Sequence, residues 1–492
     1  MDVERIVTTE GGRVRGIPSA RSANGDVTVF RGLPYAAAPF GAHRFAAPRP
    51  APEWEGVRDC AHFGPPAPQS VGMIGAHPWG SETSLDCLTL NVWSGAREGE
   101  RAPVLVWIHG GAYIVGSSAE PTYDGTRLAE NGLVVVSVNF RLGFEGYGHV
   151  PERPDNRALL DQIAALRWVR DNIAAFGGDP DGVTVAGESA GAGAVACLMA
   201  SPLARGYFRR AVAHSVPSDM VTAESARAVA ARVAEAAGAP LEPEALAELP
   251  PERLLAATDD VLRRRPGTLT CYAPVVGGPE LPVAPLRAVA GGSARDVDLL
   301  VGHNAHEYRL FTGLGEGPGI ADEAALTRAA ARAGLPEGAV ADYRALYPGA
   351  TLDELYDEIM GDALFAEYSV RFAEAHAAGG GRSHFFRLAA ETTVLGGRLG
   401  ACHAFDLPFA FGTLDTDMAR FLLDDAVTDD HWSLSKRMVD AWAAFAASGD
   451  PGWPPVTDEA TPVRVWDLVD DLHPTDPSPV RDLWRDVPLD PR

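Results

Sequence analysis

The chain alternates between short apolar runs and longer stretches rich in Ala, Leu and Arg from about residue 100 onward. The runs at 104–108, 133–139, 183–186 and 297–301 are mostly apolar throughout, which is typical of strands buried on both faces of a parallel sheet. Residues 156–176 carry apolar side chains three or four positions apart, which predicts a helix between two strands. This order of elements predicts an α/β fold, with ligands at the carboxyl ends of the strands.

Two further stretches, at about 224–265 and 322–378, have helical patterns and little strand signal. We expect them to be helical insertions that fold over the sheet edge as a cap. A final helix at 432–448 is predicted to end at the sequence GDPG. Because no linker separates differently composed halves, we expect residues 1–492 to form a single domain.

The charge balance excludes several classes of partner. The chain has 42 basic and 66 acidic residues and a net charge of -24, and Lys436 is its one lysine. Such a surface repels phosphate backbones and anionic lipid, so we expect no nucleic-acid and no membrane partner. The N-terminal sequence has no signal-peptide pattern and no apolar run approaches 18 residues, so we expect a cytoplasmic protein. The five cysteines form no C-x-x-C pair, which favours free thiols.

The strand predicted at 183–186 runs into the sequence GESAG, with Ser189 at its centre. This arrangement indicates a nucleophile elbow, a sharp turn from strand to helix in which the residues two before and two after the serine must be small. Gly187 and Gly191 meet that demand. The pattern G-x-S-x-G also arises by chance, so the rest of the chain has to supply the chemistry that a serine nucleophile needs.

A serine nucleophile needs a base, an acid that orients the base, and donors for the oxyanion. The strand predicted at 104–108 is followed by His109, Gly110, Gly111, Ala112 and Tyr113. A small-residue loop of this kind leaves backbone N–H groups free to point at one spot, and it acts together with the N–H that follows the nucleophile. That residue is Ala190.

Several longer blocks resemble the type-B carboxylesterase family of α/β-hydrolases, which includes bacterial p-nitrobenzyl esterases, liver carboxylesterases and cholinesterases. The matching blocks occur in the family's order and run nearly from end to end of the chain. They are FRGLPYA (30–36), GAHRF (41–45), DCLTLN (86–91), NFRLG (139–143), LDQ (160–162) and NIAAFGGDP (172–180).

The resemblance places the remaining members of a catalytic triad. VGHNAHE (301–307) is similar to the family's segment that ends in the catalytic acid, which implies Glu307. GACHAFDLPFAFG (400–412) resembles the catalytic-histidine loop, which implies His403 as the base. The order Ser189, Glu307, His403 is the one expected of an α/β-hydrolase.

The same resemblance implies roles for the residues around the triad. The oxyanion donors are the N–H groups of Gly111, Ala112 and Ala190, Gly110 shapes the loop, and Glu188 is a buried hydrogen-bonding residue. Arg141 and Asp161 match positions that form a structural ion pair in relatives. No metal and no organic cofactor is implied.

Three departures from the family change the expectations. Ala67 stands where secreted relatives have a cysteine that pairs with the equivalent of Cys87, so we expect no disulfide there. Leu85 replaces a glutamate, which takes away the usual partner of Arg44. Pro217 replaces a serine behind the triad, and Ser218 is the candidate substitute.

These observations predict a serine carboxylesterase that hydrolyses small-molecule esters to acid and alcohol through a covalent acyl-enzyme. One alternative is a thioester, carbamate or amide hydrolase or an acyltransferase with the same triad, because a triad fixes the chemistry better than the leaving group. A more remote alternative is a non-catalytic, cholinesterase-like binding protein. We expect a monomer or a small homo-oligomer.

Overall fold

The buried apolar runs form the central strands of one large sheet. The structure is a computed structural model that describes residues 5–70, 79–96, 99–265, 268–314, 319–424, 426–469, 471–473 and 479–489. The four predicted strands are confirmed as β6 (Ala102–Ile108), β7 (Val134–Val138), β8 (Gly178–Glu188) and β12 (Asp298–Asn304). β8 is longer than expected, because it begins immediately after Gly177 and continues to the residue before Ser189.

Within the described residues the sheet has 13 strands, in the order β1-β2-β3-β5-β7-β6-β8-β9-β12-β13-β14-β15, with β4 paired to β2. The strands from β7 to β14 pair in parallel. The other neighbours in this order pair antiparallel, and the side pair of β2 and β4 is parallel. The remaining strands are β1 (Arg5–Thr9), β2 (Gly12–Pro18), β3 (Thr28–Pro34), β4 (Val57–Asp59), β5 (Thr89–Ser94), β9 (Arg210–His214), β13 (Arg382–Leu388), β14 (Val463–Trp466) and β15 (Asp471–His473), and a separate pair is formed by β10 (Val221–Thr222) and β11 (Val275–Val276). The predicted mostly parallel α/β sheet is therefore confirmed.

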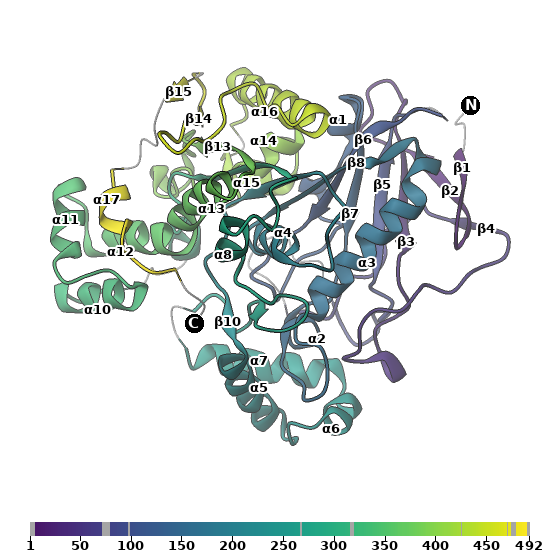
Figure 1. Cartoon of the computed structure of the whole chain (residues 1–492), viewed down its shortest axis with the longest axis horizontal. Helices are drawn as coiled ribbons and strands as arrows, with labels where there is room; N and C mark the ends of the chain where they lie inside the picture. The colour runs from purple at the N-terminus through teal and green to yellow at the C-terminus, as the bar shows by residue number, and fades with distance from the viewer. Residues whose placement is uncertain are drawn as a thin grey trace.

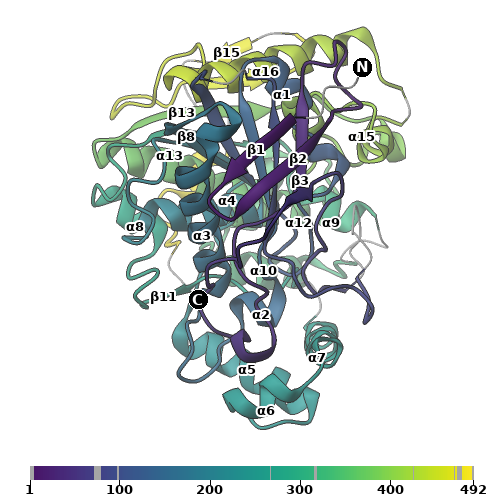
Figure 2. The same ribbon diagram turned by 90° about the vertical axis from the view of Figure 1, so that its right-hand side faces the viewer.

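Helices cover both faces of this sheet (Figures 1 and 2). The α-helices of the described residues are α1 (Thr126–Glu130), α2 (Gly143–Tyr147), α3 (Arg157–Asn172), α4 (Ala190–Ala200), α5 (Ala223–Ala237), α6 (Pro243–Glu248), α7 (Pro251–Arg263), α8 (Pro285–Ala290), α9 (Arg309–Gly313), α10 (Glu323–Ala333), α11 (Ala339–Leu346), α12 (Leu352–Gly361), α13 (Glu367–Ala378), α14 (Leu407–Phe411), α15 (Asp417–Leu422), α16 (Asp429–Ser448) and α17 (Arg481–Trp484). Successive side chains of a strand point to opposite faces, so β6 contributes Val104, Val106 and Ile108 to one core and Leu105 and Trp107 to the other. The first core contains residues of α3, α4, α8 and α13, and the second contains residues of α1, α14 and α16.

The helix expected at 156–176 is confirmed as α3 and a 3-10 turn, η3 (Ile173–Phe176). The helix expected at 432–448 begins three residues earlier, at Asp429, because Thr428 and His431 form a capping box. It is not the final helix of the chain, since α17 follows it.

The stretches at 224–265 and 322–378 contain the helices α5 to α7 and α10 to α13. In Figure 1, α5 to α7 form the lower part of the molecule and α10 to α12 lie at the left. The helices α10 to α12 and α17 have a small core of their own, which includes Leu326, Tyr343, Leu355 and Trp484. In contrast, α13 packs against β12 and β13.

None of the helices in the described ranges is long and apolar enough to span a membrane. All five cysteines are free and buried, as expected, and Cys87 has no disulfide partner.

Candidate active site

Ser189 occupies the turn between β8 and α4. Its backbone has φ 56° and ψ −126°, a conformation that non-glycine residues rarely adopt, and its N–H donates to His214 O at 2.9 Å. A Cβ on Gly187 would lie 2.5 Å from the carbonyl carbon of Gly191, and a Cβ on Gly191 would lie 2.1 Å from Ile108 O. The two glycines are therefore needed because the chain passes too close to itself and to β6 for any side chain.

The loop that follows β6 packs directly on this turn. A Cβ on Gly110 would lie 2.5 Å from Glu188 Oε2 and 3.1 Å from Ser189 Cβ. Gly111 has φ 113° and Ala112 has φ 52°, and no described residue accepts a hydrogen bond from either N–H group. The N–H of Ala190 is the first of α4, a position that helical hydrogen bonding leaves without a partner. The structure thus brings the three predicted oxyanion donors to the two segments that meet at Ser189.

The far end of the same loop is held by Gln69. Its side-chain amide donates to Gly116 O at 2.9 Å, and its carbonyl oxygen accepts from Gly116 N–H at 2.9 Å. This reciprocal pair fixes the loop without using the N–H groups of Gly111 or Ala112.

Glu307 and His403 are in direct contact. Glu307 Oε2 lies 2.5 Å from His403 Nδ1, and Glu307 Oε1 accepts hydrogen bonds from Asn304 N–H at 2.7 Å and Ser215 Oγ at 2.6 Å. Ser189, Glu307 and His403 are only 9%, 2% and 4% exposed. A carboxylate can accept about four hydrogen bonds, and Glu307 has three partners: His403, Asn304 and Ser215.

The loops that carry Glu307 and His403 are tied together by His306. Its backbone N–H donates to Ala401 O at 2.9 Å, and its ring Nδ1 accepts from Ala401 N–H at 3.0 Å. Burial lowers the pKa of His306 to about 3, and the positive charges of Arg309 and Arg387 act in the same direction. The ring is therefore neutral and can serve as an acceptor.

The second ring nitrogen of His403 faces Glu188. His403 Nε2 lies 3.0 Å from Glu188 Oε1, and no hydrogen bond joins Ser189 Oγ to His403 in the described part of the chain. Burial raises the pKa of Glu188 to about 8. Burial acts against the charged form of His403, but Glu188 and Glu307 outweigh it and raise its pKa to about 9.

Two aromatic rings that sequence analysis did not identify pack on His403. The ring centroids of Phe365 and Phe311 lie 4.3 Å and 5.2 Å from that of His403. Phe365 belongs to a π-helical turn, η4 (Asp362–Ala366), and such turns recur at functional sites. No local motif in the sequence marks either residue.

A second buried His–carboxylate pair lies behind the turn. His214 Nδ1 is 2.5 Å from Asp406 Oδ2, and His214 Nε2 accepts from Trp442 Nε1 at 3.0 Å. Asn304 Nδ2 donates to Asp406 Oδ1 at 3.1 Å, while the Asn304 N–H donates to Glu307. Asn304 therefore connects this pair to Glu307, a link that sequence analysis missed.

One expectation about the supporting residues gains a detail, and one needs correction. Arg44, whose usual partner is missing, pairs instead with Glu145 on α2, at 2.5 Å from the Arg44 guanidinium. Ser218 does not support the triad, since its Oγ donates to Ala363 O, and the serine that contacts Glu307 is Ser215.

The predicted pair Arg141 and Asp161 is confirmed. The guanidinium and carboxylate form hydrogen bonds of 2.7 and 2.8 Å, and both side chains are buried. The Arg141 guanidinium also donates to Ala46 O at 2.7 Å, so the pair joins α3 to the N-terminal part of the chain.

The parallel sheet, the strand-to-helix turn at Ser189 and the loop after β6 define an α/β-hydrolase. Residues 3–471 match the model of the carboxylesterase family. The chain belongs to this family and is a carboxylic ester hydrolase.

Individual relatives agree with this assignment. The para-nitrobenzyl esterase of Bacillus subtilis (strain 168) is 35% identical and aligns with 94% of this chain and 95% of its own length. The phenmedipham hydrolase of Pseudarthrobacter oxydans is 34% identical over 86% of this chain and 87% of its own, and the mouse (Mus musculus) cholinesterase is 31% identical over 91% and 79%. Among solved structures, carboxylesterase EST55 of Geobacillus stearothermophilus superposes with a TM-score of 0.87 at 36% identity and covers 98% of this chain and 100% of its own.

Proposed function

We propose that the chain hydrolyses small-molecule carboxylic esters through a Ser189–His403–Glu307 triad and a covalent acyl-enzyme. The observation that carries this proposal is the 2.5 Å contact between Glu307 Oε2 and His403 Nδ1 beside a serine held in a strained turn. Family membership supports ester hydrolysis, and the geometry supports these three residues as its agents.

In the first step, Ser189 Oγ attacks the ester carbonyl carbon while His403 Nε2 takes its proton. The carbonyl π electrons move to the oxygen, and the N–H groups of Gly111, Ala112 and Ala190 stabilise the negative charge. Losing one such donor typically lowers turnover by about 100- to 1000-fold. The tetrahedral intermediate then collapses, the C–O bond to the alcohol breaks, and the leaving oxygen takes the proton from His403 Nε2.

In the second step, water attacks the acyl-enzyme carbonyl and His403 takes a proton from that water. The tetrahedral intermediate expels Ser189 Oγ, which recovers its proton from His403, and the acid is released. Glu307 keeps Nδ1 protonated in both steps and stabilises the imidazolium, while Ser215 and Asn304 hold the carboxylate in place.

Glu188 affects both the position and the protonation state of His403. His403 Nε2 has to exchange its contact with Glu188 for one with Ser189 Oγ, and the imidazole has to be neutral to accept the proton. Burial favours the neutral carboxyl of Glu188, whereas Glu307, and Glu188 when it is ionised, favour the charged form of His403. Glu188 thus acts through His403, as a positioning residue.

We also propose that residues 1–492 form one hydrolase domain, with helical insertions at about 224–265 and 322–378. The separate small core of α10 to α12 supports an insertion there, and the position of α5 to α7 below the sheet in Figure 1 supports the other.

The test compares Ser189→Ala, His403→Ala and Glu307→Gln with the parent on p-nitrophenyl butyrate. Each variant is expected to lose more than about 1000-fold in kcat, since the three residues act as a unit. A fluorophosphonate probe is expected to label the parent and to leave Ser189→Ala unlabelled. The proposed mechanism is wrong if Ser189→Ala hydrolyses the ester as fast as the parent.

A further inference from the structure

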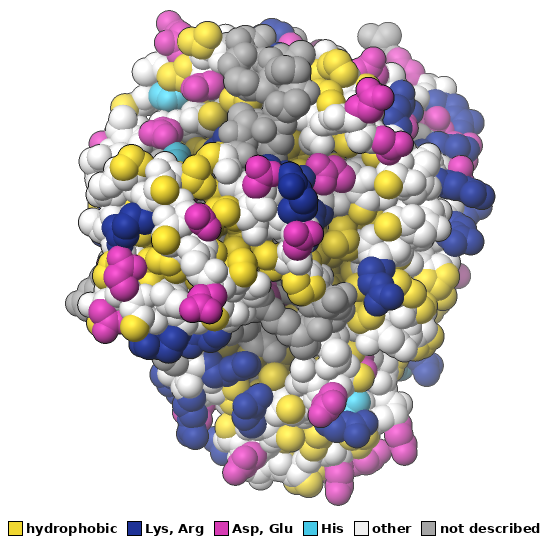
Figure 3. Space-filling view, turned by 60° about the vertical axis from the view of Figure 1, so that its left-hand side comes forward, with side chains coloured by type: hydrophobic (Ala, Val, Ile, Leu, Met, Phe, Trp, Pro, Cys, Tyr) yellow, Lys and Arg dark blue, Asp and Glu magenta, His cyan; other side chains and the backbone are white. Residues whose placement is uncertain are grey.

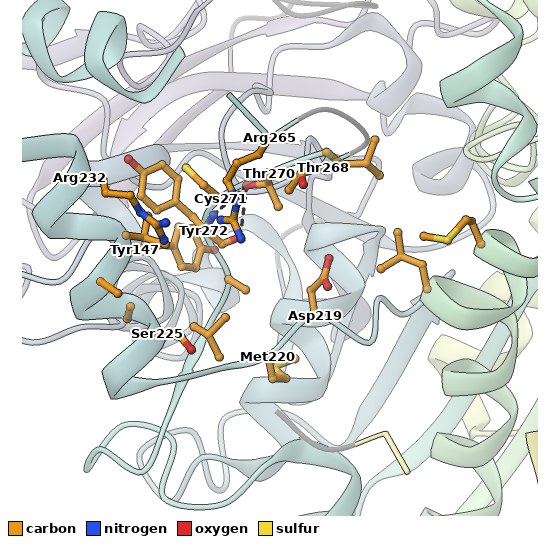
Figure 4. Close-up of a pocket in the computed structure, with 18 of the residues that line it drawn as sticks. Tyr147, Asp219, Met220, Ser225, Arg232, Arg265, Thr268, Thr270, Cys271 and Tyr272 are labelled. Atoms are coloured by element: carbon orange, nitrogen blue, oxygen red, sulfur yellow. Dashed lines mark hydrogen bonds between the residues drawn. The ribbon is translucent and has the colours of Figure 1, made fainter. Parts of the chain in front are cut away.

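Figure 4 shows a cavity of about 380 Å³. It is lined by α5, by the segment 268–273, and by residues that adjoin the active site. Its volume is in the range of small-molecule sites. Its wall is mostly apolar, and it includes two positively charged side chains, Arg232 and Arg265, and one negatively charged side chain, Asp219.

Three lining residues connect this cavity with the catalytic residues. Tyr308 follows Glu307 in the chain, and Leu364 precedes Phe365, which packs on His403. Tyr147 packs on Tyr113 of the loop after β6, with ring centroids 5.0 Å apart. These residues place the cavity next to the segments that carry Glu307, Phe365 and Tyr113.

Among the described residues, the two arginines of this cavity have no ion-pair partner, unlike their neighbours. Arg263 and Arg264, which precede Arg265, both pair with Asp260. No described residue forms an ion pair or a side-chain hydrogen bond with Arg232 or Arg265, although the chain has 66 acidic residues against 42 basic ones. Both side chains are exposed, so they lie where the cavity opens to solvent.

The two guanidinium groups act on the same part of the wall. Burial raises the pKa of the Cys271 thiol to about 11, and the positive charges of Arg265 and Arg232 act in the opposite direction. Figure 4 shows Arg232 and Arg265 with Cys271 and Tyr272 at one end of the cavity, and Asp219 toward the other. In Figure 3, dark blue side chains gather on the lower part of the molecule, the part that α5 to α7 form.

We propose that this cavity receives esters that carry an anionic group, such as a free carboxylate, remote from the scissile bond. Arg232 and Arg265 bind the anion, because guanidinium groups match carboxylates in charge and in hydrogen-bond geometry. In a chain of net charge -24, a local pair of positive charges also draws an anionic ester to this opening rather than elsewhere on the surface. This inference rests on the proposed function and names the substrate class of the same site.

Asp219 sets the direction in which such a substrate lies. Its carboxylate repels an anion from the end of the cavity near Tyr308, so the anionic group points to the arginine end. The competing assignment is a cationic ester bound by Asp219, and the experiment below separates the two.

The test measures kcat/KM for mono-p-nitrophenyl glutarate and for its neutral analogue p-nitrophenyl pentanoate. A second pair, 4-acetoxybenzoate and its methyl ester, places the carboxylate on the alcohol side. In at least one pair the parent is expected to prefer the carboxylate-bearing ester by about tenfold, the size expected for hydrogen bonds to a charged group. Salt is expected to weaken this preference.

In the double variant Arg232→Gln/Arg265→Gln, the ratio of kcat/KM for the anionic ester to that for the neutral ester is expected to fall about tenfold through KM. The matched control is Arg227→Gln, an exposed arginine of α5 that does not line the cavity, which is expected to keep the parental ratio. The proposal is overturned if the parent prefers the neutral member of both pairs, or if the double variant keeps the parental ratio. If the parent instead prefers a quaternary-ammonium ester, the proposal is also overturned, and the cavity binds cationic esters through Asp219.

Failure of this proposal and failure of the proposed function give different results. If the triad assignment is wrong, Ser189→Ala hydrolyses p-nitrophenyl pentanoate like the parent. If only the anion site is wrong, Ser189→Ala is inactive and the charge preference is absent.

Discussion

Ser215 donates a hydrogen bond of 2.6 Å from its Oγ to Glu307 Oε1, the carboxylate oxygen that does not contact His403. Ser215 directly follows β9. Its backbone has φ 56° and its N–H donates to Gly302 O at 2.7 Å, so the hydroxyl is carried by a constrained backbone. Ser215 therefore helps to keep Glu307 in contact with His403.

Ser215→Ala is expected to lower kcat by about tenfold, because a net hydrogen bond to a charged group contributes about 1.5 kcal/mol and Asn304 N–H remains. The matched control is Ser218→Ala, which removes a hydroxyl that donates to Ala363 O. Steady-state kinetics on p-nitrophenyl butyrate checks this. Equal losses in the two variants would contradict a specific role for Ser215.

Gly191→Ala is expected to disrupt the turn at the nucleophile, because its Cβ would lie 2.1 Å from Ile108 O. We expect a loss of about 1–3 kcal/mol in the free energy of unfolding and a loss of most activity. Gly80→Ala is the control, since a Cβ there meets nothing within 4 Å. Urea unfolding and esterase assays measure both effects, and a fully stable, active Gly191→Ala enzyme would contradict the requirement for glycine at this position.

The dependence of activity on pH tests the contact between Glu188 and His403. The carboxylates of Glu188 and Glu307 raise the pKa of His403, so the proton leaves the base at higher pH. The pH at which kcat/KM rises is therefore expected to lie above the ordinary range of a histidine pKa. Glu188→Gln removes the carboxyl that faces Nε2 and that favours the imidazolium when it is ionised, so the acidic limb of the profile is expected to move to lower pH. A limb that stays in place, or moves upward, contradicts the assigned electrostatic role.

The pair Arg44 and Glu145 is buried, so removing one charge leaves the other unpaired. Glu145→Gln is expected to lower the free energy of unfolding by about 3–5 kcal/mol. The control is Asp440→Asn, which breaks an exposed pair with Lys436 and is expected to cost less than about 1 kcal/mol. Chemical denaturation measures the free energy of unfolding of both variants. Similar small losses in the two would mean that Glu145 is not an essential partner of Arg44.

The sequence was sufficient to predict the parts of this molecule that local patterns encode. Apolar runs predicted the parallel strands, and the small residues at Gly187 and Gly191 predicted the turn around Ser189. His403 and Glu307 could be proposed because their surrounding segments resemble those of a family, whereas neither residue has a distinctive local pattern.

Contacts between segments distant in sequence could not be predicted. Glu145 replaces the expected partner of Arg44 from a position 101 residues away, and nothing in its own neighbourhood marks it. Phe365 reaches His403 from a π-helical turn, which has no sequence pattern of its own. The end of α16 was predicted well because Gly449 stops it, but its start was missed because a histidine replaces the usual glutamate of a capping box.

The covalent intermediate is the most direct test of the central claim. Turnover of p-nitrophenyl butyrate is quenched with acid within the first turnover, and the protein is digested and mapped by mass spectrometry. The account predicts a butyryl group on Ser189 in the parent and in the Ser218→Ala control, and none in Ser189→Ala. Acylation of another residue, with Ser189 unmodified, would contradict it.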